Sequence, residues 1–321
     1  NIDCVEEQMI VDGNFPTVVS PNPEEKAALT MAIEKAKKVN ADVVLATDPD
    51  ADRVGIAVKD NNGEFVLLNG NQTAALLTYY ILGRWNELSK FSGKEYIVKT
   101  IVTTELLIDI ANKYNVKSFD VLTGFKFIAD TILNNPEMTF VCGGEESYGF
   151  LIGDFVRDKD ANSACFMIAE IAAWAAEQNK SLYQILKEIY KEFGFYKEGL
   201  ISLTKKGISG TEEIKNMMRK FREEPPTEIL GSRIVEIKDY KIGISKDIIS
   251  GKETEIKLPK SDVLQFFTED GTKISVRPSG TEPKIKFYFG IKAELNDIAD
   301  FDTVNDKLNN RLNELGKLFS E

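Results

Sequence analysis

Residues 47–53 have the sequence TDPDADR and directly follow the apolar run VVLA at residues 43–46. A short aliphatic run of this kind is typical of a buried strand, so the acidic segment is expected to form the loop after it. Asp48, Asp50 and Asp52 stand at every second position of this loop. Three carboxylates so close together repel one another unless a cation lies among them, and their oxygens suit a hard divalent ion such as Mg²⁺.

The acidic loop could also be a simple turn, an EF-hand or part of a phosphatase. Asp and Pro are common turn residues, so the segment could be a solvated acidic turn. An EF-hand that starts at Asp48 needs Gly at its sixth position and Glu at its twelfth; this chain has Arg53 and Lys59 there, which excludes an EF-hand. A phosphatase with an aspartyl nucleophile also uses a D-x-D loop after an apolar strand, and it remains open because an Asp carboxylate can carry a phosphoryl group.

The composition narrows the possible functions. The chain has 321 residues, of which 43% are apolar and 28% charged, as expected for a soluble globular protein of two or three domains. A formal charge of −11 argues against nucleic acid or an anionic membrane as a partner. No stretch approaches the roughly 18 apolar residues of a membrane span. The chain contains no His, which excludes His-based catalytic triads and His-ligated zinc.

The cysteines and the first residues of the chain bear on its cellular location and on whether it is processed. Cys4, Cys142 and Cys165 lack the spacing of a metal site and are interpreted as free thiols, which predicts a reducing, cytoplasmic location. The first residues are acidic, unlike a signal peptide, and they lack an initiator Met. The chain is therefore expected to be a fragment or a processed product.

Expected strands alternate with expected helices along most of the chain. The expected helices are residues 24–40, 72–83, 103–114, 127–133, 162–178, 182–193, 210–223 and 302–318, and the main strands are 41–46, 54–58, 65–68, 95–102, 116–122, 139–142, 200–203, 273–276 and 284–290. This order predicts two α/β domains with mixed, largely parallel sheets, followed by a smaller α+β C-terminal domain.

Two further loops have residue types that suit ligands. Residues 277–283, RPSGTEP, combine a guanidinium, two hydroxyls and a glycine between two prolines, as an anion-binding loop would; the alternative is an ordinary hairpin with a polar tip. Residues 143–149, GGEESYG, carry two carboxylates, which can accept hydrogen bonds from neighbouring sugar hydroxyls. The alternative there is a loop whose acids lie at a helix amino terminus.

Lys126 is a candidate catalytic lysine. It lies in the predicted loop 123–126 among Phe125, Phe127 and Ile128, and apolar neighbours can lower the pKa of a lysine. The alternative is an ordinary solvated lysine.

Together, and in this order, segments 47–53, 123–126, 143–149 and 277–283 resemble the loops of the α-D-phosphohexomutase family, in its phosphoglucomutase/phosphomannomutase branch. The resemblance covers nearly the whole chain. It implies four domains around one cleft, and a phosphoserine on the first domain that gives its phosphoryl group to a hexose monophosphate. A bisphosphate intermediate then reorients and returns the other phosphate to the serine.

The resemblance also implies a role for each matching residue. Asp48, Asp50 and Asp52 match the Mg²⁺ ligands. Arg53 matches an arginine beside the transferred group, and Lys126 matches a general acid/base. The substrate-binding residues implied are Gly124, Glu145 and Ser147 for the sugar, and Arg277, Ser279, Gly280 and Thr281 for the phosphate that is not transferred.

One part of the family pattern is missing. The serine loop of the family, Thr-Ala-Ser-His-Asn-Pro, cannot occur in a chain without His, and the similar segment at residues 20–23 lies too close to the metal loop to replace it. We therefore expect residues 1–68 to be domain 2, incomplete at its amino terminus, residues 69–193 to be domain 3, and residues 194–321 to be domain 4. The full-length protein would be the enzyme, and this chain alone would be inactive.

The expected reaction of the full-length protein interconverts hexose 1-phosphate and hexose 6-phosphate, with glucose 1,6-bisphosphate as activator and intermediate. The sequence EESY at residues 145–148 resembles the glucose-directed form of the sugar loop, while mannose and pentose phosphates remain open as substrates. Two further functions are retained as alternatives: an Mg²⁺-dependent phosphatase that uses Asp48, and a non-catalytic phosphosugar-binding fragment. The sequence does not indicate an oligomeric state.

Overall fold

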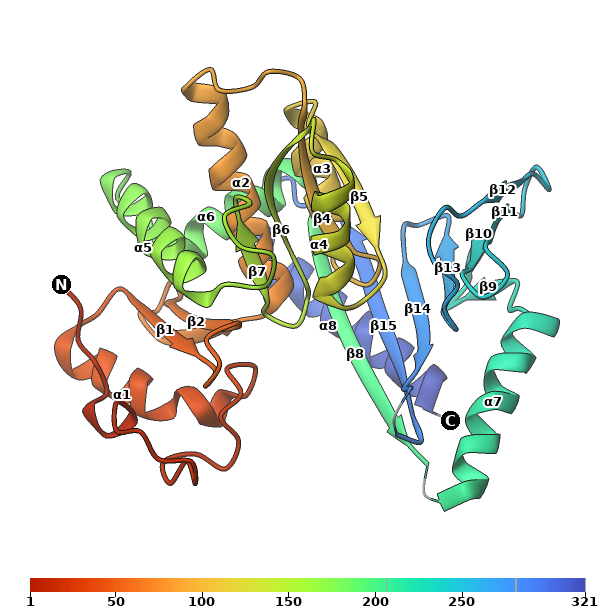
Figure 1. Ribbon diagram of the computed structural model, residues 1–321, viewed down its shortest axis with the longest axis horizontal. Helices are drawn as coiled ribbons and strands as arrows, with labels where there is room; N and C mark the ends of the chain where they lie inside the picture. Colours follow the sequence, from red (N-terminus) through yellow and green to blue (C-terminus); the bar gives the residue numbers. More distant parts are fainter. Residues whose placement is uncertain (206, 281, 321) are drawn as a thin grey trace. The chain divides into compact units, whose positions relative to one another are not determined.

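The computed structural model describes residues 1–205, 207–280 and 282–320, and leaves out the side chains of residues 207–209. The chain forms two compact units, Asn1–Phe193 and Gly194–Glu321, whose helices and strands are labelled in Figure 1. No helix among these residues is long and apolar enough to cross a membrane. Cys4, Cys142 and Cys165 are free thiols, as predicted.

The first unit begins with a small antiparallel sheet. Strands β1 (Val43–Thr47), β2 (Val54–Lys59) and β3 (Phe65–Leu68) pair in the order β1-β2-β3, and helix α1 (Thr30–Val39) packs on them. The prediction of a largely parallel sheet is wrong here. The loops at residues 48–53 and 60–64 are too short for the crossover that parallel neighbours require, so both pairs are antiparallel.

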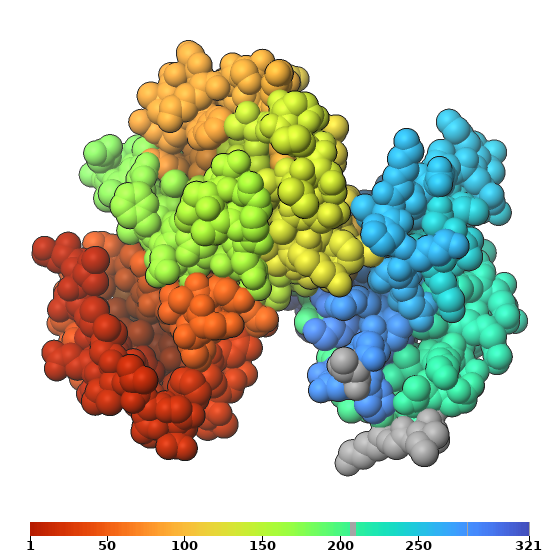
Figure 2. Space-filling view, viewed as in Figure 1, coloured from red at the N-terminus to blue at the C-terminus, as the bar shows by residue number. Residues whose placement is uncertain are grey.

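Residues 1–29 contain little regular structure, with two short 3₁₀ turns, η1 (Glu6–Gln8) and η2 (Lys26–Leu29). Figure 2 shows the amino-terminal residues (red) as a lobe at one end of this unit. One part of this segment packs tightly on the sheet, because a Cβ added to Gly55 would lie 2.3 Å from the carbonyl oxygen of Pro23. Large apolar side chains of the segment stay exposed: Ile2, Met9, Ile10, Val11 and Val19.

The rest of the first unit is an α/β arrangement, as predicted. Strand β4 (Glu95–Thr100) pairs in parallel with β5 (Lys117–Val121) and β6 (Thr139–Gly144). The three-residue strand β7 (Phe150–Ile152), which was not predicted, returns antiparallel to β6. The helices of this part are α2 (Gly70–Glu87), α3 (Leu106–Lys113), α4 (Phe125–Asn134), α5 (Ala161–Glu177) and α6 (Leu182–Phe193).

Burial in this part follows the sheet. The strands and α4 share a core in which Val98, Ile128 and Leu151 are fully buried. The carboxyl ends of β4 and β6 lead into the segments 101–105 and 145–149. Because β4 and β6 are parallel neighbours, these two segments emerge at the same edge of the sheet.

The second unit, Gly194–Glu321, is an α+β structure, as predicted, and it is shorter than the first unit, Asn1–Phe193. An antiparallel sheet in the order β12-β11-β10-β13-β14-β15-β8 forms its centre, and β9 pairs with β10. Phe221, Phe287 and Phe319 pack together between helices and sheet. The elements are β8 (Phe195–Thr204), α7 (Gly207–Glu223), β9 (Glu228–Ile229), β10 (Ser232–Asp239), β11 (Ile244–Asp247), β12 (Glu253–Glu255), β13 (Leu264–Thr268), β14 (Lys273–Pro278), β15 (Lys284–Ala293), η3 (Ile298–Asp300) and α8 (Phe301–Ser320).

Gly55→Ala tests the contact between residue 23 and the sheet. The added methyl group would overlap the backbone carbonyl of Pro23, so either this segment or β2 must move. We therefore expect the free energy of unfolding to fall by about 1–3 kcal/mol. Urea unfolding of the chain measures the change. Gly13→Ala is the matched control, because a Cβ at Gly13 meets nothing within 4 Å. Equal stability of both variants would show that residues 22–24 do not pack on β2.

Candidate active site

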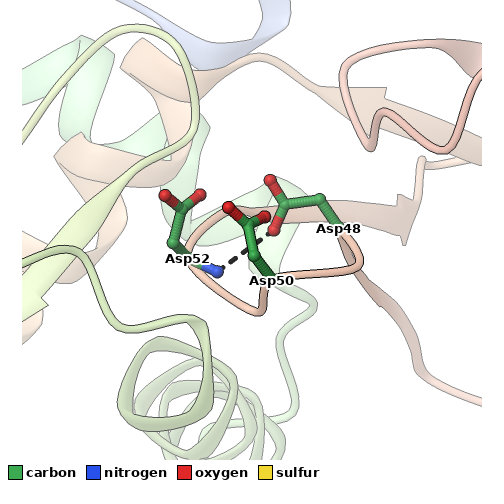
Figure 3. Close-up of side chains that lie close together, drawn as sticks. All are labelled: Asp48, Asp50 and Asp52. Carbon is green, nitrogen blue, oxygen red and sulfur yellow. Dashed lines mark hydrogen bonds between the residues drawn. The ribbon is translucent and has the colours of Figure 1, made fainter.

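The acidic loop after β1 brings its three carboxylates together. Figure 3 shows the side chains of Asp48, Asp50 and Asp52 converging, and one oxygen from each lies within 4.8 Å of the other two. Asp48 Oδ1 accepts hydrogen bonds from the backbone N–H groups of Asp52 (3.1 Å) and Arg53 (3.0 Å). Ala51 takes the left-handed conformation, with φ 55°, that makes this tight turn possible.

The electrostatics of the loop fit a cation. Burial and the charges of Asp52 and Asp50 raise the pKa of Asp48 and outweigh the two backbone hydrogen bonds that lower it. Asp52 Oδ1 is buried and accepts no hydrogen bond from any residue that the structure describes. Ligand oxygens about 2.1 Å from one Mg²⁺ lie roughly 3–4 Å apart, so only small side-chain movements would bring the three oxygens onto one ion. The three aspartates predicted as metal ligands therefore form a set that suits Mg²⁺.

Arg53 lies beside these carboxylates. Its guanidinium is 3.8 Å from Asp48 and 3.7 Å from Asp52, and its third ion pair, 3.5 Å, is with Glu24. About a third of its side chain remains exposed. Because the side chain is partly exposed, the guanidinium can still donate hydrogen bonds to an anionic ligand while it pairs with the acids.

The turn predicted to bind sugar is joined to the metal loop through the backbone. Residues 145–148 form the turn between β6 and β7, closed by a hydrogen bond from Glu145 N–H to the Gly149 carbonyl (2.9 Å). The N–H of Val54 donates to the carbonyl of Tyr148 (3.1 Å), and Arg53 forms a β-bridge with Gly149. The metal loop and the sugar turn are thus neighbours although they are about a hundred residues apart in the chain.

Glu145 connects this turn to the segment 123–126. Its Oε1 accepts a hydrogen bond from the N–H of Gly124 (2.9 Å), and only 9% of the residue is exposed. Burial raises the pKa of Glu145 above its ordinary value, against the lowering effect of that hydrogen bond. Ser147 lies half-buried at the tip of the same turn.

Lys126 is not surrounded by apolar side chains as expected. Helix α4 already begins at Phe125, so Phe125 and Ile128 turn into the core while Lys126 lies on the exposed side of the first turn. Its Nζ is 5.0 Å from the ring centroid of Phe127.

Lys159, which the sequence analysis did not single out, is the lysine that reaches the metal loop. Its Nζ forms an ion pair with Asp52 Oδ2 (2.7 Å), and its aliphatic chain covers Gly149, where an added Cβ would lie 2.2 Å from Lys159 Cδ. The ammonium also lies 5.5 Å from the Phe125 ring. Burial lowers the pKa of Lys159, but the contacts with Asp52 and Asp158 outweigh it and raise the pKa overall.

The predicted phosphate loop belongs to the second unit. Arg277 and Lys286 face each other across β14 and β15, and Lys284 lies two residues before Lys286 on the same face. Ser279 N–H donates to the Lys284 carbonyl (2.7 Å), and Ser279 Oγ accepts from Glu282 N–H (3.3 Å), which shapes the loop. Gly280 is exposed. Thr281 lies outside the described residues.

Comparison with known families agrees with this architecture. The models of the phosphoglucomutase/phosphomannomutase alpha/beta/alpha domain II, alpha/beta/alpha domain III and C-terminal domain match residues 1–63, 69–193 and 234–301. The chain belongs to the α-D-phosphohexomutase family.

Relatives of this phosphohexomutase chain include curated phosphoglucomutases from staphylococci. It is 37% identical to the phosphoglucomutase of Staphylococcus epidermidis (strain RP62A), over 97% of this chain and 55% of the relative. It is 39% identical to that of Staphylococcus aureus (strain MRSA252), over 96% of this chain and 54% of the relative. The chain thus spans about half the length of the curated relatives it matches.

Solved structures share the fold of this phosphohexomutase chain. A putative phosphomannomutase from Thermus thermophilus has a TM-score of 0.60 at 18% identity, and the match covers 94% of this chain and 52% of that one. Parafusin, a phosphoglucomutase from Paramecium, has a TM-score of 0.58 at 18% identity, and the match covers 92% of this chain and 50% of that one.

Asp50→Asn tests the metal site. Asp50 is exposed and Asp48 shapes the loop, so the amide at position 50 should remove a ligand charge without unfolding the turn. We expect the dissociation constant for Mg²⁺ to rise by about tenfold or more, measured by calorimetric titration. Asp130→Asn, an exposed substitution on α4, is the control and should leave the titration unchanged. An unchanged titration of Asp50→Asn would exclude the site.

Glu145→Gln tests the buried carboxylate. A folded-state pKa above the ordinary 4.5 means that the unfolded chain loses its proton first as pH rises, so Glu145 lowers stability at neutral pH. The glutamine variant keeps an acceptor for Gly124 and should unfold at a higher urea concentration than the parent at pH 7. The difference should disappear below about pH 4, where both states are protonated. Exposed Glu137→Gln is the control, and a difference that does not change with pH would contradict the assignment.

Proposed function

We propose that the complete protein is a phosphoglucomutase-type phosphohexomutase, which interconverts hexose 1-phosphate and hexose 6-phosphate through a bisphosphate. The observation that carries the proposal is the backbone connection between the metal loop and the sugar turn, through the hydrogen bond from Val54 to Tyr148. This hydrogen bond keeps the metal loop, whose charges would act on a phosphoryl group, beside the sugar turn, whose Glu145 and Ser147 could bind sugar hydroxyls. The curated relatives named phosphoglucomutase, at 37–39% identity, support this choice of reaction.

In this proposal the first unit handles the phosphoryl group that is transferred. Asp48, Asp50 and Asp52 would hold Mg²⁺, which when bound offsets negative charge on a phosphoryl group in transfer. Arg53 would offer its guanidinium to the same group, and its ion pair with Glu24 (3.5 Å) would help to position it. The serine that carries the phosphoryl group would be supplied by residues outside these 321, because a Ser-His-Asn-Pro loop cannot occur in a chain without His.

The sugar and the second phosphate would be held by other residues. Glu145 would accept hydrogen bonds from sugar hydroxyls with the oxygen that Gly124 leaves available, and Ser147 would add its hydroxyl. Arg277, Ser279, Gly280 and Thr281 would bind the phosphate that is not transferred. We also propose the domain limits 1–68, 69–193 and 194–321 for the family domains 2, 3 and 4.

Two lysines are candidates for moving the proton of the reacting sugar hydroxyl. Lys126 matches the family motif in sequence and is exposed. Lys159 is favoured by geometry, because its ammonium already lies 2.7 Å from a proposed metal ligand and its chain covers the sugar turn. A base must come within hydrogen-bond reach of the proton that it takes, so the position of the amine decides between them.

Turnover by the full-length protein tests the proposed reaction. With Mg²⁺ and glucose 1,6-bisphosphate, it should convert glucose 1-phosphate to glucose 6-phosphate faster than it converts mannose or pentose phosphates. Lys159→Met should lower kcat by about 10²–10⁴-fold if Lys159 moves the proton, and Lys126→Met should do so if Lys126 does. A coupled dehydrogenase assay measures both.

Three outcomes would contradict the proposal. Appreciable turnover by residues 1–321 alone would show that the phosphoryl carrier lies within them. Release of inorganic phosphate with a covalent adduct on Asp48, trapped with a fluoride mimic of phosphate, would favour the phosphatase alternative. Binding of glucose phosphate by the full-length protein without any turnover would leave a non-catalytic phosphosugar-binding protein.

Arg277→Ala tests the phosphate loop. Loss of the guanidinium removes a charge-assisted contact, so the KM of the full-length protein for glucose 1-phosphate should rise by about tenfold or more. Lys252→Ala, an exposed substitution in the same unit, is the control. An unchanged KM for Arg277→Ala would remove residues 277–281 from the proposed site.

A further inference from the structure

The two adjacent glutamates of the sugar turn have different partners. Glu145 is bonded to Gly124 N–H, in the segment before α4. Glu146 points the other way, and its Oε2 lies 3.0 Å from Thr100 Oγ1 and 3.3 Å from Thr103 Oγ1, at the carboxyl end of β4. These two contacts of Glu146 are with side-chain hydroxyls and converge on Oε2, whereas the contact of Glu145 is with a backbone N–H, so the two glutamates are held by different parts of the fold.

The hydroxyls that meet Glu146 are cut off from water. Thr100 and Thr103 are both 0% exposed, and their Oγ1 atoms lie 2.8 Å apart. The three oxygens share two hydroxyl protons, so at most two of the three contacts are hydrogen bonds at one time. Buried hydroxyls are costly without acceptors, and an ionised carboxylate is a stronger acceptor than a second hydroxyl. Glu146 is therefore the acceptor for a pair of buried hydroxyls that are also in contact with each other.

The segment that carries Thr100 and Thr103 is fixed to the sheet and to α2. Lys99, the residue before Thr100, is fully buried and forms ion pairs with Glu105 (3.0 Å) and Asp120 (2.9 Å). Thr104 N–H donates to Asn71 Oδ1 (2.9 Å) in the first turn of α2. The buried Lys99 ammonium needs these partners, so the two ion pairs and the bond to Asn71 fix the end of β4 to its neighbours.

The backbone of the turn also rests on α2. A Cβ added to Gly70 would lie 2.0 Å from the carbonyl oxygen of Glu146 and 3.0 Å from the N of Tyr148. This backbone contact does not depend on the Glu146 side chain. Removal of the carboxylate should therefore loosen the turn without unfolding the unit.

We propose that Glu146 is a positioning residue, which fixes the sugar turn to the carboxyl end of β4 through the hydroxyls of Thr100 and Thr103. Through this anchor it sets how strictly the turn distinguishes one sugar epimer from another. The inference rests on the proposed function, because it assumes that Glu145 and Ser147 contact the sugar. Glu146 orders these two neighbours and does not itself touch the substrate.

Hydrogen exchange of the full-length protein tests the anchor without reference to activity. The backbone amides of residues 145–149 should exchange about tenfold faster in Glu146→Ala and in Thr100→Val. Glu146→Gln and Thr100→Ser keep an acceptor and a hydroxyl, and should stay within about threefold of the parent. Exposed Glu137→Ala is the control. Unchanged exchange in Glu146→Ala would overturn the anchor.

Steady-state kinetics of the same variants test the effect on the sugar. In Glu146→Ala the KM for glucose 1-phosphate should rise by about tenfold, and the ratio of kcat/KM for glucose 1-phosphate over mannose 1-phosphate should fall by a similar factor, with Glu146→Gln restoring both. A purely structural role would lower the active fraction and leave this ratio unchanged, and that result would overturn the inference. If the parent shows no mutase activity, the proposed function fails, while the exchange experiment still decides the anchor.

Discussion

The site is built around carboxylates that lie close together and are partly withdrawn from water in the first unit. Asp48, Asp50 and Asp52 share one loop, and Glu145 belongs to a turn bonded to that loop. The pKa values of Asp48 and Glu145 are both raised, chiefly by burial, which shows that the folded chain disfavours their charges. Converging carboxylates of this kind suit a bound cation, which would offset their mutual repulsion. A divalent cation among the aspartates would reverse the pKa shift of Asp48.

The two cations that the first unit does provide also hold its loops together. Arg53 belongs to the metal loop and bridges Gly149 of the sugar turn. Lys159 comes from the segment after β7, covers that turn and pairs with Asp52. Each of these two residues therefore offsets the charge of the aspartates and also holds the metal loop beside the sugar turn. A phosphate that entered the site would compete with the aspartates for Arg53 and Lys159. A bound Mg²⁺ would make this competition easier, because it would offset the charge of the aspartates in their place.

Local sequence patterns were sufficient for the elements and loops, and insufficient where long-range contacts decide. The order of strands and helices predicted the α/β part correctly, and the spacing of three aspartates correctly predicted that their carboxylates lie together. Loop lengths of five and six residues already exclude parallel pairing of β1, β2 and β3, so that error came from extending the α/β pattern too far. The sequence pattern puts the start of α4 two residues late and so predicts Lys126 in a loop. In the helix, neighbouring residues point in directions about 100° apart, so Phe125 is buried and Lys126 is exposed. Lys159 lacked any local signal, since only the fold brings it to Asp52.

Glu145 and Glu146 show most clearly what a pattern of residue types leaves undecided. They are identical and adjacent, so neither composition nor spacing distinguishes them, and in a turn their side chains can leave in different directions. The backbone N–H of Gly124 lies on one side, and the hydroxyls of Thr100 and Thr103 lie on the other. A single backbone donor contacts Oε1 of Glu145, whereas two buried side-chain hydroxyls converge on Oε2 of Glu146. The difference in partners thus comes from the parallel pairing of β4 with β6, which brings residues 100–103 beside a turn that follows them by more than forty positions.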